Sequence, residues 1–287
     1  MGIVYVGIGL FGGLGPFFIR PITARYGFRA ALISVALLMF ATWPLAMLFL
    51  RDKPSDVGQN PDGLPDAPEE IRMPPQSFAS LLRSGSFWLL LLGSVCSIGS
   101  IGSVNFHMKF VFREEGFANQ KALDASWAVA TTLILWSSIL GRLGIGYLAD
   151  LFPKKLVMTA TYFAVAATIL LLLSVSPSRP YSLYVFAIAF GVSMGADYFL
   201  IPLMAAEQFG VNTLARAMAI ILPANTIGQT WCPELVSILR EHYSNYVFPM
   251  AVVLAISLAG AIAIALIPRT APSQIVDTVR MPSRAET

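Results

Sequence analysis

The chain has 287 residues, of which 56% are hydrophobic and only 12% are charged, and its mean hydropathy is +0.70. Soluble domains average about 45–50% apolar and about 25% charged residues, so this composition excludes an ordinary soluble fold. The net charge of +3 is small, and the basic residues lie between apolar runs rather than in one patch, which argues against nucleic acid as a partner. The expected neighbour is the lipid bilayer.

The apolar residues are grouped in runs of about 20, the length that crosses the hydrocarbon layer of a membrane as a helix. These runs must be helical because lipid offers the backbone no hydrogen-bond partner. The sequence therefore predicts an all-α membrane protein with about eight transmembrane helices. The predicted spans are Ile3 to Pro21, Phe28 to Leu50, Phe87 to Phe106, Leu123 to Gly144, Leu156 to Ser174, Leu183 to Met204, Ala217 to Ile238 and Val247 to Ile267.

One polar segment, residues 51–83, separates the second span from the third and is rich in Pro, Asp and Glu. Such a composition predicts a solvated linker. It divides the chain into two spans in 1–50, a six-span part in 84–268, and a tail in 269–287. Lys and Arg are somewhat more frequent in the loops on the linker's side, which predicts a cytoplasmic linker and tail and a multi-pass protein of the cell membrane, inner or plasma.

No pattern for enzymatic chemistry is present. Cys96 and Cys232 both fall inside apolar runs, without CxxC spacing or a nearby histidine cluster, so they read as buried small residues. There is also no P-loop, no dinucleotide-binding glycine fingerprint and no GxSxG elbow. The sequence predicts a protein that is not an enzyme and that holds neither a cofactor nor a metal.

The most specific stretch runs from Gly141 to Lys155, at the predicted loop between the fourth and fifth spans, and reads G-R-x-x-x-G-x-x-A-D-x-x-x-K-K. Glycines allow helix backbones to approach closely, Asp150 can face a helix N-terminus or pair with Arg142, and the lysines favour the cytoplasmic side. The stretch resembles the cytoplasmic-loop signature of the major facilitator superfamily. That resemblance implies a latch between helices, formed by Gly141, Arg142, Gly146, Asp150, Lys154 and Lys155. The alternative is an ordinary positive-inside turn with a helix cap.

Two looser resemblances extend over nearly the whole chain. Gly15-Pro16, Tyr26 to Arg29 and the segment Leu50 to Gly58 are similar to the fifth helix, sixth helix and central loop of bacterial facilitators. The segment Glu207-Gln208-Phe209-Gly210 and the span after it are similar to facilitators of the monocarboxylate and oxalate-formate type. The resemblance implies secondary transport of a small solute, an organic anion or monocarboxylate, by alternating access and without ATP.

A standard facilitator has twelve helices, so the resemblance implies that this chain corresponds to helices five to twelve of an N-terminally truncated member. The family's solute cavity lies between two six-helix halves, near the middle of the bilayer. The alternative to transport is therefore a membrane remnant that acts only as a packing or interaction partner.

Asp197 is the outstanding polar residue within the predicted spans, because an ionised side chain in hydrocarbon costs about 2.5–3.5 kcal/mol on insertion scales. Gly191 and Gly195 precede it and Pro202 follows, which favours a locally irregular helix beside a cavity. Two interpretations stay open: a proton-coupling or solute-binding group, or an aspartate paired with an arginine or hydroxyl between helices.

Five further residues are candidates for solute or proton contact. Asn225 and Gln229 stand at i and i+4, hence near one face of a helix, and either bind solute oxygens or bond between helices. Asn105 and His107 end the third span; His107 either senses external protons or is a hydrated interfacial histidine. Trp136 lies deep in the fourth span and either contacts solute or packs as a large apolar side chain.

Overall fold

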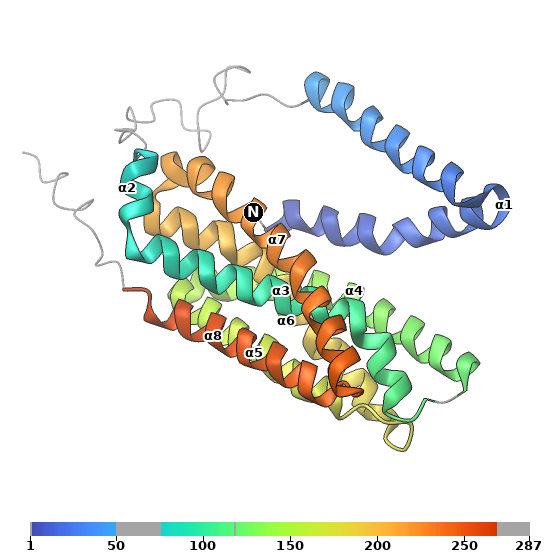
Figure 1. The fold of residues 1–287 in the computed structure, drawn as a ribbon. Coiled ribbons are helices and arrows are strands. Elements are labelled where there is room, and N and C mark those ends of the chain that lie inside the picture. Colours follow the sequence, from blue (N-terminus) through green and yellow to red (C-terminus); the bar gives the residue numbers. More distant parts are fainter. Residues whose placement is uncertain (1, 50–75, 118, 269–287) are drawn as a thin grey trace, which may run out of the picture. The chain divides into compact units, whose positions relative to one another are not determined.

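A computed structural model describes residues 2–49, 76–117 and 119–268. Apart from short turns, this part of the chain is helical and contains no β-strand beyond one isolated bridge. The all-α class predicted from composition is therefore confirmed. The helices, shown in Figure 1, are α1 (Gly2–Phe49), α2 (Phe78–Arg83), α3 (Gly85–Glu114), α4 (Gln120–Leu151), α5 (Lys154–Leu173), α6 (Pro180–Phe209), α7 (Val211–Tyr243) and α8 (Val247–Leu266).

The chain divides into two compact units, one of residues 10–74 and one of residues 1–9 together with 75–287. The first unit contains most of α1, which is two helical arms joined at Gly27, where the backbone is not helical (φ 80°, ψ 172°). Only glycine takes this positive φ without strain, and it stands where the first and second predicted spans meet. Two parts of the predicted resemblance to facilitators are not described by the structure. These are the surroundings of Gly15 and Pro16, and residues 50–58.

The last residues of the predicted linker form the short helix α2. Ser77 caps it by accepting a hydrogen bond from the Ser80 backbone N–H at 3.1 Å, and Leu81 is fully buried. Just before α2, the Gln76 backbone N–H donates to Thr213 Oγ1 at 3.1 Å, and Arg216 Nη1 donates to the Gln76 carbonyl at 2.6 Å. The chain therefore enters the second unit anchored to the first turns of α7.

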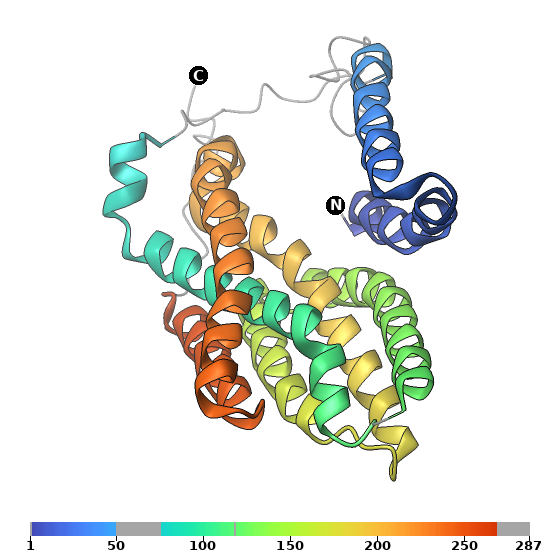
Figure 2. The ribbon, with the colours of Figure 1, turned by 45° about the vertical axis from the view of Figure 1, so that its right-hand side comes forward.

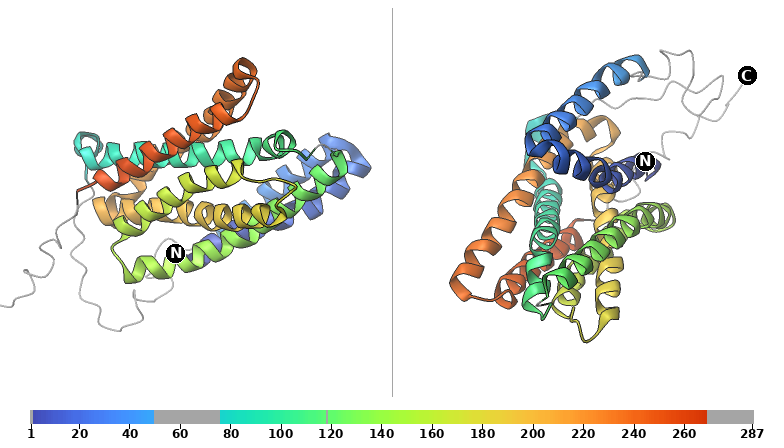
Figure 3. Two further views of the ribbon diagram at one scale, coloured as in Figure 1. Left: turned by 90° about the horizontal axis from the view of Figure 1, so that it is seen from below. Right: turned by 90° about the vertical axis from the view of Figure 1, so that its right-hand side faces the viewer.

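In the second unit, α3 is the central helix. It packs against α7 and α8, while α4 packs against α6 and α5 packs against both α6 and α8. Figure 2 shows α3 between α7 and α8 on one side and α6 on the other, and the left view of Figure 3 shows α4 on the outer side of α6. The helices α3 to α8 lie in the part of the chain, residues 84–268, for which six spans were predicted.

Small residues set the spacing between the paired helices. A Cβ added to Gly93 of α3 would lie 3.2 Å from the Gly260 carbonyl oxygen of α8, and one on Gly228 of α7 would lie 3.0 Å from the Val95 carbonyl oxygen of α3. In the α4–α6 pair, a Cβ on Gly195 would collide with the Ser138 backbone. Close backbone approach of this kind is how helices associate where lipid removes the hydrophobic driving force.

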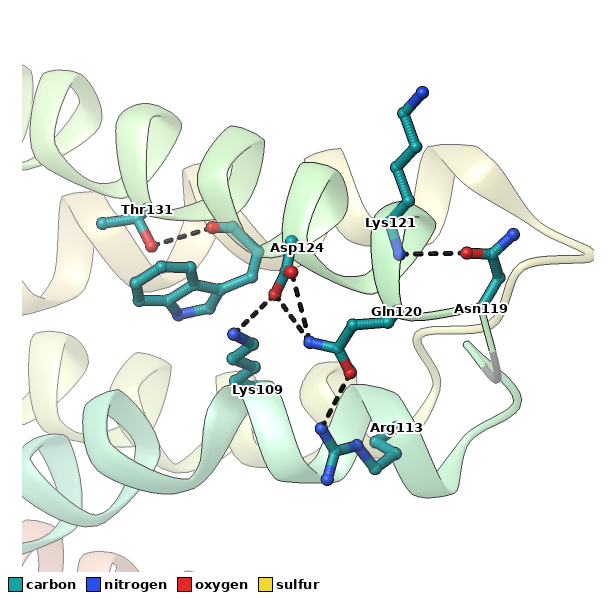
Figure 4. A network of polar contacts seen from close by, with 8 residues as sticks. Lys109, Arg113, Asn119, Gln120, Lys121, Asp124 and Thr131 are labelled. Atoms are coloured by element: carbon teal, nitrogen blue, oxygen red, sulfur yellow. Dashed lines mark hydrogen bonds and ion pairs between the residues drawn. The ribbon is translucent and has the colours of Figure 1, made fainter.

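The turn between α3 and α4 is held by a polar network (Figure 4). Lys109 Nζ forms an ion pair with Asp124 at 2.6 Å and lies 4.9 Å from the Trp127 ring centroid. Gln120 donates to both oxygens of Asp124 and accepts from Arg113 Nη2 at 3.1 Å. These contacts explain why both helices extend several residues beyond the predicted apolar spans, since ion pairs stabilise helical turns outside the hydrocarbon.

Within the described residues, six helical stretches are long and apolar enough to cross a membrane: Pro21–Phe49, Gly85–Glu114, Gln120–Leu151, Lys154–Leu173, Pro180–Phe209 and Val247–Leu266. The predicted span Ala217 to Ile238 lies within α7, which has 33 residues but many polar ones, so α7 falls outside this set. Together the long apolar helices and their pairwise packing give a multi-pass membrane fold.

Candidate functional site

The motif from Gly141 to Lys155 is mostly helix, and the prediction of a loop there is wrong. α4 continues to Leu151, and only Phe152 and Pro153 separate it from α5. The helix persists because Gly141 packs against α6, where an added Cβ would collide with the Val192 backbone. Tertiary contact thus outweighs the weak helix propensity of glycine.

The remaining motif residues have different surroundings. A Cβ on Gly146 would meet the Phe199 ring at 3.7 Å, an ordinary contact. Asp150 is exposed, and within the described residues it forms no ion pair with Arg142. Lys154 Nζ lies 3.0 Å from Glu207 Oε2, which joins the start of α5 to the end of α6. Three motif positions therefore touch α6, and Asp150 faces outward.

Arg142 lies inside the second unit rather than in a surface turn. It is 5% exposed, and its Nε and Nη1 atoms are buried without a hydrogen-bond partner among the described residues. Tyr198 of α6 faces the guanidinium, and Gln229 Nε2 of α7 donates to the Tyr198 hydroxyl at 2.8 Å. We call Arg142, Tyr198 and Gln229 the Arg142 cluster. It joins α4, α6 and α7 and leaves cationic N–H donors unused.

Asp197 is adjacent to Tyr198 in sequence but has other neighbours. It is fully buried, and Ser97 of α3 donates to its Oδ2 at 2.9 Å. The hydroxyl of Tyr162 faces this carboxyl from α5. Ser97, Tyr162 and Asp197, which we call the Asp197 cluster, thus lie in the packed core of α3, α5 and α6.

Asn225 and Gln229 bond to different helices, although they stand one turn apart on α7. Asn225 is 6% exposed and accepts a hydrogen bond from Ser94 Oγ of α3 at 2.9 Å. Gln229 is exposed and bonds Tyr198 of α6. Interhelical bonding accounts for Asn225, whereas Gln229 belongs to the Arg142 cluster.

Asn105 and Trp136 are both on the surface of the second unit. Asn105 Nδ2 donates to the Met194 sulfur at 3.5 Å, and the Trp136 side chain is 63% exposed. Neither residue is part of the core of its own unit. Both therefore remain available for contact with a solute or lipid.

The prediction that His107 is a hydrated interfacial residue is wrong, because it contacts Pro233 within α7 and Tyr246 just before α8 and is only 2% exposed. Its Nε2 lies 3.0 Å from the Pro233 carbonyl and its Nδ1 lies 3.3 Å from the Tyr246 hydroxyl. The carbonyl only accepts, so Nε2 carries the proton, and in the neutral ring Nδ1 accepts from Tyr246. Burial raises the pKa of Tyr246, which keeps that hydroxyl a donor.

Sequence reasoning missed Tyr198 and the interior position of Arg142. A signal for Arg142 was present, because the predicted fourth span Leu123 to Gly144 included it, and an arginine inside a span is a functional candidate. Because Arg142 matched the loop signature, the sequence predicted a position in a cytoplasmic loop instead. Among the described residues, no group of three or more His, Cys, Asp or Glu side chains is placed to hold a metal.

The helical packing agrees with a sequence comparison. The family model described as Major Facilitator Superfamily matches residues 119–282, more than half of the chain. The chain belongs to the major facilitator superfamily. A search of the curated proteins found no match. This facilitator is therefore a multi-pass membrane protein of a family that transports solutes across membranes, a function distinct from enzymatic catalysis.

Proposed function

We propose that this facilitator carries a small organic anion of the monocarboxylate type by alternating access. The observation that supports the proposal is Arg142, a buried guanidinium whose Nε and Nη1 have no partner among the described residues. A buried charge without a counter-charge is strongly unfavourable, and a carboxylate is the partner that guanidinium N–H groups bind most strongly. A solute anion supplies this missing charge.

The neighbours of Arg142 favour a solute rich in acceptor oxygens. The Tyr198 oxygen accepts from Gln229 Nε2, which leaves the Tyr198 O–H free to donate. A carboxylate held by Arg142 can accept that second hydrogen bond. A neutral amide of the same shape leaves the guanidinium charge uncompensated, so the cluster selects the anion.

Asp197 is the candidate for coupling to protons. It is a fully buried carboxyl whose neighbours Ser97 and Tyr162 carry neutral hydroxyls, and it stands on the same helix turn as Tyr198. Taking up a proton removes the charge from the core of α3, α5 and α6. Its bond to Ser97 also serves helix packing, and the pH dependence of uptake distinguishes the two roles.

The remaining motif residues, Gly141, Gly146, Asp150, Lys154 and Lys155, are proposed as a gate. Gly141 allows α4 and α6 to approach closely, and Lys154 at the start of α5 forms an ion pair with Glu207 near the end of α6. A change in the α4–α6 packing would then be transmitted to this end of the unit.

The test is uptake of a labelled small monocarboxylate by proteoliposomes containing the full chain. We expect saturable uptake, loss of uptake in Arg142→Gln, and no loss in Lys121→Gln, which removes an exposed positive charge from the first turn of α4. Absence of flux in the wild type would favour a non-transporting packing or interaction partner. Equal uptake by Arg142→Gln and the wild type would contradict the anion site.

A further inference from the structure

The second unit has an apolar cavity between α4, α5 and α6. It has a volume of about 430 Å³ and is lined mainly by aliphatic and aromatic side chains, with Thr161 and Ser193 the polar exceptions. The cavity forms because α4 packs on α6 and α5 packs on α6 and α8, with few contacts between α4 and α5, although only Phe152 and Pro153 connect them. A hydrocarbon chain bound in this space would contact all three helices.

A second cavity, with a volume of about 590 Å³, lies beside the first turns of α5, between the end of α6 and Ala265 of α8. Leu156 lines both cavities, so they share a wall. The second one, which we call the polar cavity, has four polar side chains in its lining beside apolar ones: Lys155, Thr159, Glu207 and Gln208. An apolar space therefore adjoins a polar one at the end of the helices.

The polar cavity is electropositive. Glu207 is paired with Lys154 at 3.0 Å, whereas Lys155 has no ion-pair partner within the described ranges. Thr159 Oγ1 is buried and lacks a hydrogen-bond partner there. No side chain caps the N-terminus of α5, so its first backbone N–H groups add partial positive charge at the same place. A hydroxyl, an ammonium and free N–H groups together fit a phosphate.

We propose that the paired cavities form a binding site for an anionic phospholipid. One acyl chain lies in the apolar cavity between α4 and α5, and the phosphate of the headgroup lies in the polar cavity near Lys155 and Thr159. The bilayer surrounds this membrane protein and supplies the ligand, and the sign of the unpaired charge selects an anionic headgroup over a zwitterionic one. This site is independent of the Arg142 cluster.

The headgroup is tested by native mass spectrometry of the full chain, released from micelles containing equal amounts of phosphatidylglycerol and phosphatidylcholine. We expect the wild type to retain phosphatidylglycerol about fivefold more than phosphatidylcholine, the factor that one lysine near a membrane surface contributes. Lys155→Gln removes the preference and Lys155→Arg restores it. Lys121→Gln, the matched loss of an exposed charge at the start of α4, leaves it unchanged.

The acyl chain is tested by Ala164→Phe, because this alanine is exposed in the apolar cavity and a phenyl ring there takes the place of the chain. We expect lower retention of both lipids, without change in the ratio between them. Equal retention of the two lipids by the wild type, a preference that survives Lys155→Gln, or unchanged retention in Ala164→Phe would each overturn the proposal. Helical circular dichroism of each variant confirms that it is folded.

Discussion

The Arg142 and Asp197 clusters are neighbouring buried sites with ionisable side chains, and they differ in the partners that surround those side chains. Asp197 is fully buried and Arg142 is 5% exposed, so both side chains lie in the interior of the unit. Asp197 accepts a hydrogen bond from Ser97 and is faced by the Tyr162 hydroxyl in the core of α3, α5 and α6, whereas Arg142 leaves two nitrogens unpartnered among the described residues. Burial alone thus does not distinguish a structural charge from a functional one. Unused bonding capacity does, because it marks where a ligand improves the free energy.

The two clusters lie side by side because of helix geometry. Asp197 and Tyr198 are consecutive on α6, and successive residues of an α-helix point about 100° apart. Asp197 therefore faces α3 and α5, while Tyr198 faces Arg142 of α4 and Gln229 of α7. The same turn of α6 therefore places Asp197 in the core and Tyr198 in the candidate solute site.

The largest expected effect is a difference in ligand stabilisation between Arg142→Gln and the wild type. A monocarboxylate at about 100 times its Kd should stabilise the wild type by about 2.7 kcal/mol, because it binds the folded state and satisfies the guanidinium. Arg142→Gln should show no such stabilisation, and its ligand-free thermal midpoint should not fall, because the variant removes an unpaired buried charge. Thermal unfolding in detergent, with and without the acid, measures both. A large ligand shift retained by the variant would contradict the comparison.

Asp197→Asn should separate coupling from packing. The amide oxygen still accepts the bond from Ser97, so we expect a loss of about 1 kcal/mol of stability or less. Uptake driven by a pH gradient should disappear, while solute exchange at equal pH on both sides should continue. Proteoliposome uptake with and without the gradient is the measurement. If proton dependence persists, Asp197 has a packing role only.

Two tyrosine variants compare the clusters directly. Tyr198→Phe removes a hydroxyl that bonds Gln229 and faces Arg142, and we expect the KM for the solute to rise about threefold to tenfold, the effect of one hydrogen bond. Tyr162→Phe removes a buried hydroxyl that faces Asp197 rather than Arg142, so KM should hardly change. Equal effects of the two variants on KM would remove Tyr198 from the solute site.

The smallest effect on solute preference is expected for Asp150→Asn, because Asp150 is exposed and distant along α4 from Arg142. If Asp150 acts in the gate, Asp150→Asn changes the relative populations of the inward-facing and outward-facing states. Gly144→Cys is a suitable reporter, since a Cβ there meets nothing within 4 Å. We expect its labelling rate from one side of the membrane to change with Asp150→Asn. An unchanged rate from both sides would exclude Asp150 from the gate.

Much of the fold was predictable because hydrocarbon imposes a simple rule on sequence. Each predicted span from Phe87 to Ile267 lies almost entirely within one of the helices α3 to α8, and Gly27 stands at the predicted break in α1. The helix ends were less predictable, since residues such as Lys109 and Asp124 extend α3 and α4 through polar contacts that hydropathy does not register. The loop predicted at Gly141 failed for the related reason that packing on α6 sustains a glycine-containing helix.

The candidate site was only partly predictable. Asp197, Arg142 and Gln229 stood out by residue type, because polar groups in apolar runs are few. Their partners were not evident, since Ser97 and Asp197 are a hundred residues apart in the chain and meet only through helix packing. His107 illustrates the same limit: its position near the end of a span indicated hydration, but Tyr246 and Pro233 cover it.

By itself, the sequence determined the environment, the helical class and the family resemblance of this protein, because the length and polarity of a run decide whether it can remain in lipid. Only the tertiary structure decided which polar groups are satisfied. Hydrogen bonding depends on the positions of two partners in space, and the α4, α6 and α7 packing that brings Arg142, Tyr198 and Gln229 together arises from contacts between segments distant in sequence.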